Sequence, residues 1–428
     1  MLLKQAGATF SGIAFGVACS GDDAAGEDPS AGSGGEGICG SAAGNTSSGG
    51  TGAGTTGGSS AGTTGGSAGA GAGTGGMAQA GSSGAPPGDS GVSNDAAVTG
   101  DAGSGRPVVA IVHRESLDDA VARAVELAGG LDAIQPGQSV FIKLNGVSDR
   151  AVGTPGIRTS NEMIAAVIKL VKTRNPGRII VGDRSARQFP DTAAVFRNAG
   201  IEEAALAAGA DEVYAAPTPE ADPDAWLLLQ PESYETSWSA AGGILCMRRI
   251  IEADHLINVP TCKNHRYALF SLSMKNFIGA IGDSSRDPLH FGDSIAGSFG
   301  PIGRDIAILN VPFQPLLNIL DASVALINGG PQGDSADAVR TTPGLVLASR
   351  DRVALDAAGV SLIKLHLGRT DVPQPDASHD TLMSTNAWAL PQIVEGGMRG
   401  LGVSSAADVD LAFDDVADEA EIEALFRA

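Results

Sequence analysis

A regular alternation of apolar, β-branched runs with amphipathic helical segments constrains the fold of this chain more than any other feature. Residues 107–112, 139–145 and 178–183 are rich in Val and Ile and have the length of buried strands. Between them lie two helical patterns, 117–127 and 163–172, with apolar residues recurring every three or four positions. This β-α-β-α-β order predicts an α/β fold with a mostly parallel sheet and helices on both of its faces.

The alternation continues toward the end of the chain after one interruption. Residues 215–242 contain prolines, acids and two tryptophans, and they are predicted to form an excursion or a small subdomain. Strands are expected at 244–247, 255–259, 324–328, 344–348 and 409–413, a long helix at 351–367, and an acidic terminal helix at 419–428. Residues 106–428 are long enough for one large domain or for two closely joined lobes.

Residues 1–18 have the pattern of a secretory signal peptide. One lysine, Lys4, precedes a mostly small and apolar stretch that ends in Gly16-Val17-Ala18-Cys19. Such a run is too short to span a bilayer as a mature helix. A cysteine after small residues resembles the bacterial lipoprotein signal, which implies that Cys19 is lipidated. The protein is then held in the cell envelope, periplasmic or surface-exposed, and contacts the membrane only through its lipid anchor; the alternative is a plainly secreted form.

Residues 19–105 form a low-complexity segment of Gly, Ser, Thr and Ala with scattered acids. Such a composition cannot bury enough apolar area to offset the loss of chain entropy, so this segment is predicted to be disordered. A flexible chain of this length has an end-to-end distance of about 50 Å. It would therefore serve as a tether between the anchor and the folded domain; the alternative is compositional drift without function.

The charge of the chain argues against a nucleic-acid partner. The formal net charge is −21, and residues 1–105 hold eight acids against Lys4, which leaves the rest of the chain near −14. Proteins that bind nucleic acids need basic surfaces that displace counterions from phosphates. Aromatic residues, at 4 %, are also too scarce to offer many stacking surfaces for bases.

The four cysteines do not form a disulfide scaffold in a chain of 428 residues. Cys246 and Cys262 lie at the edges of neighbouring predicted strands, and whether they pair in an oxidising compartment stays open. Cys-x-x-Cys spacing is absent, so no ferredoxin-type iron–sulfur cluster is expected.

Most of the chemically versatile side chains of the folded part lie within residues 254–290. An apolar run that ends in Val259-Pro260 is predicted to be a buried strand, and the polar residues Lys263, His265, Lys275, Asn276 and His290 follow it. Three of the six histidines lie in this window. Because ligands of open α/β sheets bind beyond the carboxyl ends of the strands, these residues are predicted to form a site. The alternative is that they solvate loops and stabilise turns.

Other predicted strand ends carry polar residues that would lie at the same edge of the sheet. These residues are Lys143, Asn145, Asp183, Asn328 and Asp351, with Gly329-Gly330-Pro331-Gln332-Gly333 directly after one strand. A single Asp after a strand is often only a helix cap, but several such ends pointing the same way predict a crevice. The glycine-rich segment, which includes Gly330, would offer backbone amides to an anion but lacks the lysine of a P-loop.

This succession of motifs resembles the bacterial and archaeal family known as domain of unknown function 362. The matching segments are Lys143-Leu-Asn145, Thr159-Ser160, Val181-Gly-Asp183, Asp254-His-Leu-Ile-Asn-Val-Pro-x-x-Lys263-x-His265, Met274-Lys275-Asn276-x-x-Gly279, His290, Gly329-Gly-Pro331 with Gly333, and Asp351-x-Val-Ala-Leu-Asp356. They cover roughly residues 108–367 in order. Some members of the family carry ferredoxin-type clusters, whose cysteines this chain lacks, and membership does not fix a reaction.

A second, more distant resemblance concerns the spacing of His265, Lys275 and His290. It is similar to the His–Lys–His arrangement of lactate racemase-like proteins, in which the lysine holds a nickel pincer nucleotide and histidines serve the metal or the substrate. The Gly-rich run expected before that lysine is Leu-Phe-Ser-Leu-Ser in this chain. The resemblance therefore implies a distant common fold rather than that cofactor.

Two functions of different class agree with these observations. The first is an enzyme in which Lys263, His265, Lys275 and His290 surround a small anionic substrate. In it, His265 or His290 would move a proton or hold a divalent metal. Lys143, Asn145, Asp183, Asn276, Gly330 and Asp351 would then bind the substrate or orient these groups. The second is a tethered solute- or metal-binding lipoprotein that uses the same crevice without catalysis.

Overall fold

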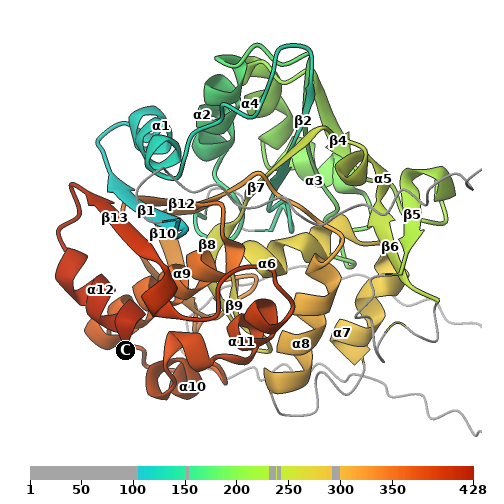
Figure 1. Cartoon of the computed structure of the whole chain (residues 1–428). Coiled ribbons are helices and arrows are strands. Elements are labelled where there is room, and N and C mark those ends of the chain that lie inside the picture. Colours follow the sequence, from blue (N-terminus) through green and yellow to red (C-terminus); the bar gives the residue numbers. More distant parts are fainter. Residues whose placement is uncertain (1–104, 151–153, 231–237, 239–241, 292–298) are drawn as a thin grey trace, which may run out of the picture. The chain divides into compact units, whose positions relative to one another are not determined.

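An eleven-stranded mixed sheet organises the part of the chain that the structure describes, namely residues 105–150, 154–230, 238, 242–291 and 299–428 (Figure 1). In this computed structural model the main path of the sheet runs β13-β1-β12-β10-β7-β2-β3-β4. These strands are β1 (Val108–His113), β2 (Ser139–Leu144), β3 (Arg178–Asp183), β4 (Glu212–Ala215), β7 (His255–Val259), β10 (Leu317–Asn328), β12 (Leu345–Ser349) and β13 (Asp410–Asp414). The predicted signal peptide, Cys19 and all but the last residue of the predicted tether lie outside the described residues.

Helices cover both faces of the sheet and bury apolar residues against it or against one another. On one face lie α1 (Leu117–Leu127), α2 (Asn161–Lys172), α3 (Thr192–Asn198) and α4 (Ile201–Ala208). On the other lie α6 (Ser273–Asn276), α7 (Asp287–Phe291), α8 (Phe299–Asn310), α9 (Arg352–Arg369), α10 (His379–Ser384), α11 (Pro391–Met398) and α12 (Glu419–Arg427). Figure 1 shows α1, α2 and α4 on the opposite side of the sheet from α9 to α12. The predicted α/β fold with helices on both faces is confirmed.

Helix α9 is buried on nearly all sides, although its sequence has no strong apolar stripe. It packs on β10 and β12 with one side and on α10, α11 and α12 with the other. Asp351 caps it by accepting hydrogen bonds from the N–H groups of Val353 and Ala354 at 2.9 and 2.8 Å. The acidic terminal helix predicted from the sequence is α12, one of the helices that cover α9.

One strand of the main path, β12, runs against all the others. β1, β10, β7, β2, β3, β4 and β13 share one direction, whereas β12 is antiparallel to both of its neighbours, β1 and β10. The chain returns from β10 through the short strand β11 (Val339–Thr341) with no crossover helix, and such a connection reverses direction. The residue that follows β12 therefore emerges at the edge opposite to the ends of β2, β3 and β10.

Pro260 splits the sheet at the position where β2 ends. β7 pairs with β2 from Val140 to Leu144, but beyond Pro260 the strand β8 (Thr261–His265) pairs only with β10 and with β9 (Leu269–Ser271). The backbone of Pro260 has no N–H to give to a ladder, while its carbonyl accepts from the N–H of Asp321 at 2.9 Å. The long strand β10 spans both halves, so the ends of β2 and β8 diverge and open a gap.

The predicted excursion is a two-stranded antiparallel ribbon. After the turn at Pro223–Ala225, β5 (Trp226–Leu229) pairs with β6 (Ile244–Met247), which leads into α5 (Arg248–Ile251). The run 244–247, expected in the main alternation, therefore belongs to this ribbon. Most of the turn between β5 and β6 lies outside the described residues. The predicted edge strand at 409–413 is confirmed as β13, and the run 324–328 is the end of the longer β10.

Cys246 and Cys262, whose pairing the sequence left open, are both free and buried. Burial raises the pKa of Cys246 to about 12 and raises the pKa of Cys262 even further. Both thiols are therefore inert packing groups rather than nucleophiles. None of the described helices has the length and apolar character that crossing a bilayer requires.

Candidate functional site

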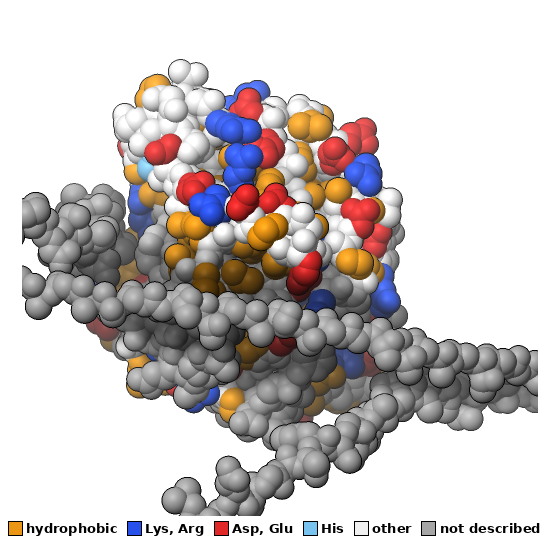
Figure 2. Space-filling view, turned by 90° about the vertical axis from the view of Figure 1, so that its right-hand side faces the viewer, with side chains coloured by type: hydrophobic (Ala, Val, Ile, Leu, Met, Phe, Trp, Pro, Cys, Tyr) orange, Lys and Arg blue, Asp and Glu red, His pale blue; other side chains and the backbone are white. Residues whose placement is uncertain are grey.

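A cavity of about 710 Å³ lies where the carboxyl ends of β2, β3 and β8 meet the loops after β10. Its lining includes six Lys or Arg side chains against two carboxylates, Asp183 and Asp334. The six cationic residues are Arg184, Arg187, Lys263, Arg266, Lys275 and Arg286. This excess contrasts with the acidic chain as a whole and with the surface in Figure 2, where acids and bases are intermixed. A cavity of this size and charge suits a small anion.

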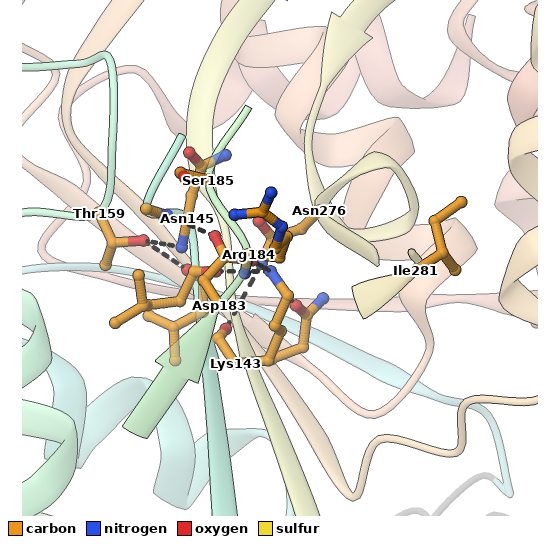
Figure 3. A network of polar contacts seen from close by, with 12 residues as sticks. Lys143, Asn145, Thr159, Asp183, Arg184, Ser185, Asn276 and Ile281 are labelled. Carbon is orange, nitrogen blue, oxygen red and sulfur yellow. Dashed lines mark hydrogen bonds and ion pairs between the residues drawn. The ribbon is translucent and has the colours of Figure 1, made fainter. Parts of the chain in front are cut away.

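Asp183, the last residue of β3, forms part of one wall of the cavity and is paired with Lys143 near the end of β2 (Figure 3). Lys143 Nζ lies 2.8 Å from Asp183 Oδ1 and donates to the carbonyl of Leu144 at 2.7 Å. Asp183 also accepts from the N–H of Gly146 at 2.6 Å and from that of Arg184 at 2.8 Å. Burial lowers the pKa of Lys143, and the charge of Asp183 opposes that effect. Lys143 thus lies behind the wall, and Asp183 faces the cavity.

Gly279 is a glycine because the ion pair passes directly beside its backbone. A Cβ at this position would lie 1.9 Å from Asp183 Oδ1 and 2.8 Å from Lys143 Nζ. Any side chain would therefore push the pair apart. The carbonyl of Gly279 also accepts from the N–H of Arg184 at 3.1 Å, which joins the 3-10 helix Phe277–Ala280 after α6 to the end of β3.

Lys263 is a buried lysine of β8 whose ammonium is satisfied by carbonyls alone. It donates to the carbonyls of Ile157 at 2.6 Å and Pro331 at 3.2 Å. Burial lowers the pKa of Lys263 to about 7, with a further contribution from the charge of Lys275. A lysine with this pKa exchanges protons near neutral pH.

Lys275 projects from the short helix α6 and lines the same cavity. Among the residues that the structure describes, none forms a hydrogen bond or ion pair with its ammonium. Burial lowers the pKa of Lys275 to about 7, and the charge of Arg286 adds to this effect. Asp356 of α9 caps helix α6 by accepting hydrogen bonds from the N–H groups of Ser273 and Met274 at 2.6 and 3.1 Å.

His265, the last residue of β8, is buried and has a defined hydrogen-bonding role. Its Nδ1 accepts from the backbone N–H groups of Tyr267 and Ala268, both at 3.2 Å. In a neutral ring the proton therefore lies on Nε2. Such a ring is suited to donating a hydrogen bond to a ligand oxygen. It does not favour the predicted metal role, because Nε2 carries the proton instead of a lone pair.

The structure brings several of the other predicted site residues to the cavity. Asn145 and Asn276 line it together with Asp183. Asn145 Oδ1 is buried without a hydrogen-bond partner among the described residues, which leaves an acceptor for a ligand. Asn276 Nδ2 donates to Asn258 Oδ1 at 2.8 Å.

Three predicted residues, Lys143, Asp351 and Gly330, do not line the cavity. Asp351 does not line the cavity: it caps α9 at the opposite edge of the sheet, because β12 runs antiparallel to its neighbours. Gly330 lies beside the lining, but its N–H donates to Asn264 Oδ1 at 2.9 Å and is not available to an anion. The backbone of His290 belongs to α7, and its side chain lies outside the described residues.

The sequence did not indicate two residues that shape the site. Arg286 is buried, and its guanidinium donates to the carbonyls of Ile281, Ser185 and Arg184 at 3.1, 2.7 and 3.2 Å. Thr159 fills the gap in the split sheet: its hydroxyl accepts from the N–H of Asn145 at 2.8 Å and donates to the carbonyl of Val259 at 2.7 Å. In the sequence, Thr159 stood out only as part of the family segment Thr159-Ser160, and Arg286 was not assigned to the site.

No group of three or more His, Cys, Asp or Glu side chains suited to a metal ion occurs within residues 105–428, apart from the gaps in that range. The sequence had proposed His265 and His290 as metal ligands. Of the two, only the side chain of His265 is described, and its Nδ1 is already an acceptor for backbone N–H groups.

Comparisons with known proteins identify a family for this chain but no reaction. A family model described as Domain of unknown function (DUF362) matches residues 140–361. A thylakoid-associated protein of Synechocystis sp. is 26 % identical over 244 residues, which are 56 % of this chain and 68 % of that protein.

Two solved structures show more remote similarity. The lactate racemase apoprotein of Thermoanaerobacterium thermosaccharolyticum is 17 % identical with a TM-score of 0.34, covering 54 % of this chain and 53 % of that one. A protein of Thermotoga maritima is 12 % identical with a TM-score of 0.34, covering 55 % of each chain. This chain thus spans about half the length of either structure.

Proposed function

The chain belongs to the family described as domain of unknown function (DUF362), and we propose that it is an enzyme acting on a small anionic molecule in the cavity of Lys263, His265 and Lys275. One observation carries this proposal. An acidic protein with a formal net charge of −21 gathers six cationic residues around one cavity, and Lys275 has no hydrogen-bond or ion-pair partner among the described residues. A partly buried charge without a partner in a cavity favours a ligand of opposite sign.

Charge and hydrogen bonding assign a role to each group. Arg286 carries a permanent charge at the cavity and is fixed by three carbonyls, so it would attract the anion without moving. Lys263 and Lys275, both with a pKa of about 7, can each gain or lose a proton near neutral pH. His265 would donate from Nε2 to an oxygen of the substrate.

The two lysines favour catalysis over simple capture. A receptor that only holds an anion works best with lysines that stay charged, whereas proton transfer needs groups whose pKa lies near the operating pH. Two neighbouring lysines with a pKa of about 7 meet the second requirement. Capture without catalysis, as in a solute-binding protein, is the competing outcome of the experiment below.

The proposal includes export and anchoring, for which the support is the segment that ends in Ala18-Cys19. Lipidation of Cys19 would hold the enzyme in the cell envelope, with residues 20–105 as a tether. Metabolic labelling with a fatty acid tests this point: label should enter the wild type and not Cys19→Ala. Label retained by Cys19→Ala would show that the attachment lies elsewhere.

Thermal unfolding of the full chain with a panel of small carboxylates and phosphates tests the site. A stabilising compound should lose its effect in Lys275→Met and keep it in Lys364→Met. Lys364 is a suitable control because it is a largely buried lysine outside the cavity that donates to the carbonyl of Thr385 at 2.6 Å. Compounds that stabilise are then incubated with the protein and followed by NMR. Turnover supports an enzyme, binding without turnover supports capture, and no stabilisation contradicts both.

A further inference from the structure

We propose that Lys275 forms an imine with the carbonyl group of a small oxo acid, a molecule that carries a ketone or aldehyde close to a carboxylate. This inference rests on the proposed function, because it names the class of anion that the cavity would receive. It adds a covalent step that anion binding alone does not require.

The first reason is that Lys275 differs from the other lysines withdrawn from solvent. Lys143 pairs with Asp183 at 2.8 Å, and Lys263 donates to two carbonyls. Lys364 donates to the carbonyl of Thr385. In the described part of the chain, the Lys275 amine has no such partner, although it lines a cavity of about 710 Å³. Its protonated form is therefore not stabilised by a hydrogen bond or an ion pair, which favours the neutral amine with a free lone pair.

The second reason is the charge of the surroundings. Lys263 and Arg286 lie on the same cavity lining as Lys275, and their positive charges disfavour a third one. The nearby carboxylate of Asp183 cannot neutralise Lys275 easily, because Lys143 and two backbone N–H groups already occupy it. Burial together with the charge of Arg286 lowers the pKa of Lys275 to about 7, so much of the amine is neutral at neutral pH. A desolvated lysine beside another cation is an activated nucleophile.

The third reason is that the cavity offers groups suited to a carbonyl substrate. Lys263 and Arg286 would hold the carboxylate, and the N–H at Nε2 of His265 would donate to the carbonyl oxygen as charge develops on it. Asn145 Oδ1, buried without a partner among the described residues, would accept a hydrogen from the adduct. Because Asp356 fixes the first turn of α6, the backbone that carries Lys275 is held in place.

The step is balanced without any further reagent. The neutral Nζ of Lys275 attacks the carbonyl carbon, a C–N bond forms, and the oxygen gains a proton to give a carbinolamine. The C–O bond then breaks and the oxygen leaves as water, with one hydrogen from Nζ and one proton from the solvent. The remaining Nζ hydrogen stays on the protonated imine. Reduction of this imine would fix the adduct permanently on the lysine.

The experiment incubates the full chain with pyruvate, glyoxylate or 2-oxoglutarate and sodium cyanoborohydride and locates the reduced adduct by peptide mass mapping. At limiting oxo acid, we expect the adduct mainly on Lys275 in the wild type and in Lys364→Arg, and its loss in Lys275→Arg. Mapping the wild type alone locates the adduct, so the test does not depend on the folding of a variant. Exposed lysines such as Lys169 and Lys172 report the background reaction.

The possible results separate this inference from the proposed function. Adducts confined to exposed lysines with all three oxo acids, at equal levels in Lys275→Arg, would overturn the imine. If anions without a carbonyl, such as sulfate, still stabilise the wild type through Lys275, the proposed anion site stands without the imine. If no anion stabilises the protein and no adduct forms on Lys275, both ideas fail.

Discussion

Asp356 Oδ1 on helix α9 accepts a 2.6 Å hydrogen bond from the backbone N–H of Ser273, the first residue of α6. Its second oxygen accepts from Met274 at 3.1 Å and from Gln392 at 3.3 Å. The carboxylate thus caps a helix of one turn from a neighbouring element, and that turn carries Lys275 and Asn276 into the cavity. The central helix of one face of the sheet thereby fixes the position of the proposed nucleophile.

Asp356→Asn should weaken both the cap and the pH dependence of stability. Burial raises the pKa of Asp356 to about 7 from an ordinary value of 3.8, so the folded state holds a proton that the unfolded state has lost. Stability from this group is therefore full below pH 4 and decreases as pH rises to about 7, by up to about 4 kcal/mol. Urea unfolding at pH 5 and pH 8 should show a smaller difference in Asp356→Asn than in wild type. Asp191→Asn, an exposed cap of α3, should keep the wild-type difference.

Affinity for sulfate should fall as pH rises through about 7. Sulfate keeps its charge over this range, whereas burial lowers the pKa values of Lys263 and Lys275 to about 7, so the protein loses positive charge. Calorimetric titration at pH 6 and pH 9 should show several-fold weaker binding at pH 9. Lys275→Met should bind more weakly at pH 6 and depend less on pH. If the wild type binds sulfate equally well at both pH values, Lys263 and Lys275 do not supply the charge that binds the anion.

Gly279→Ala should disrupt the Lys143–Asp183 pair. The new methyl group would lie 1.9 Å from Asp183 Oδ1, so the pair must separate inside the protein. Breaking a buried ion pair costs about 3–5 kcal/mol, and we expect a loss of that order in the free energy of unfolding. Gly368→Ala is the matched control, because its nearest contact beyond the neighbouring backbone is an ordinary 3.8 Å to the Met383 side chain. If Gly279→Ala is as stable as the control, the backbone after α6 can shift to accommodate the methyl group without separating the Lys143–Asp183 pair.

Thr159→Val tests the hydroxyl that bridges the split sheet. Valine keeps the shape of threonine but leaves the N–H of Asn145 and the carbonyl of Val259 without their partner. Each unsatisfied buried group costs about 1–3 kcal/mol, so the variant should unfold at clearly lower urea concentration. Thr173→Val, at the exposed end of α2, removes a hydroxyl that also donates to a carbonyl and should change stability little. If the two variants have similar urea midpoints of unfolding, the Thr159 hydroxyl does not stabilise the split between β2 and β8.

The order and type of most elements follow from the sequence because they depend on local patterns. The runs at β1, β2 and β3 are apolar and β-branched over the length of a buried strand, and α2 has an apolar residue at nearly every inward position. The cluster of lysines and histidine after Pro260 also predicts where the cavity lies, because parallel strands release their ends at one edge. Lys263, His265 and Lys275 all line it.

Contacts between distant segments determined the features of the site that the sequence did not predict. Asp351 was assigned to the cavity because the strand before it was expected to point the same way as the other site strands, and only the pairing of β12 with β10 and β1 shows that its end lies at the other edge. No local pattern shows that Asp183, rather than Lys143, faces the cavity, or that Arg286 lies beside Lys275. Nor does the sequence tell that the side chain of Asp356 caps a helix 83 residues earlier.

The amino-acid sequence alone determined the α/β class, the family and the edge of the sheet that carries the site, because periodicity and motif spacing are properties of neighbouring residues. Only the tertiary structure decided which lysine is paired and which is unpaired, because the charge state of a buried amine depends on groups that the fold brings near it from other strands and helices. Lys143 and Lys275 are both buried or partly buried lysines near glycine, and the difference between them is Asp183.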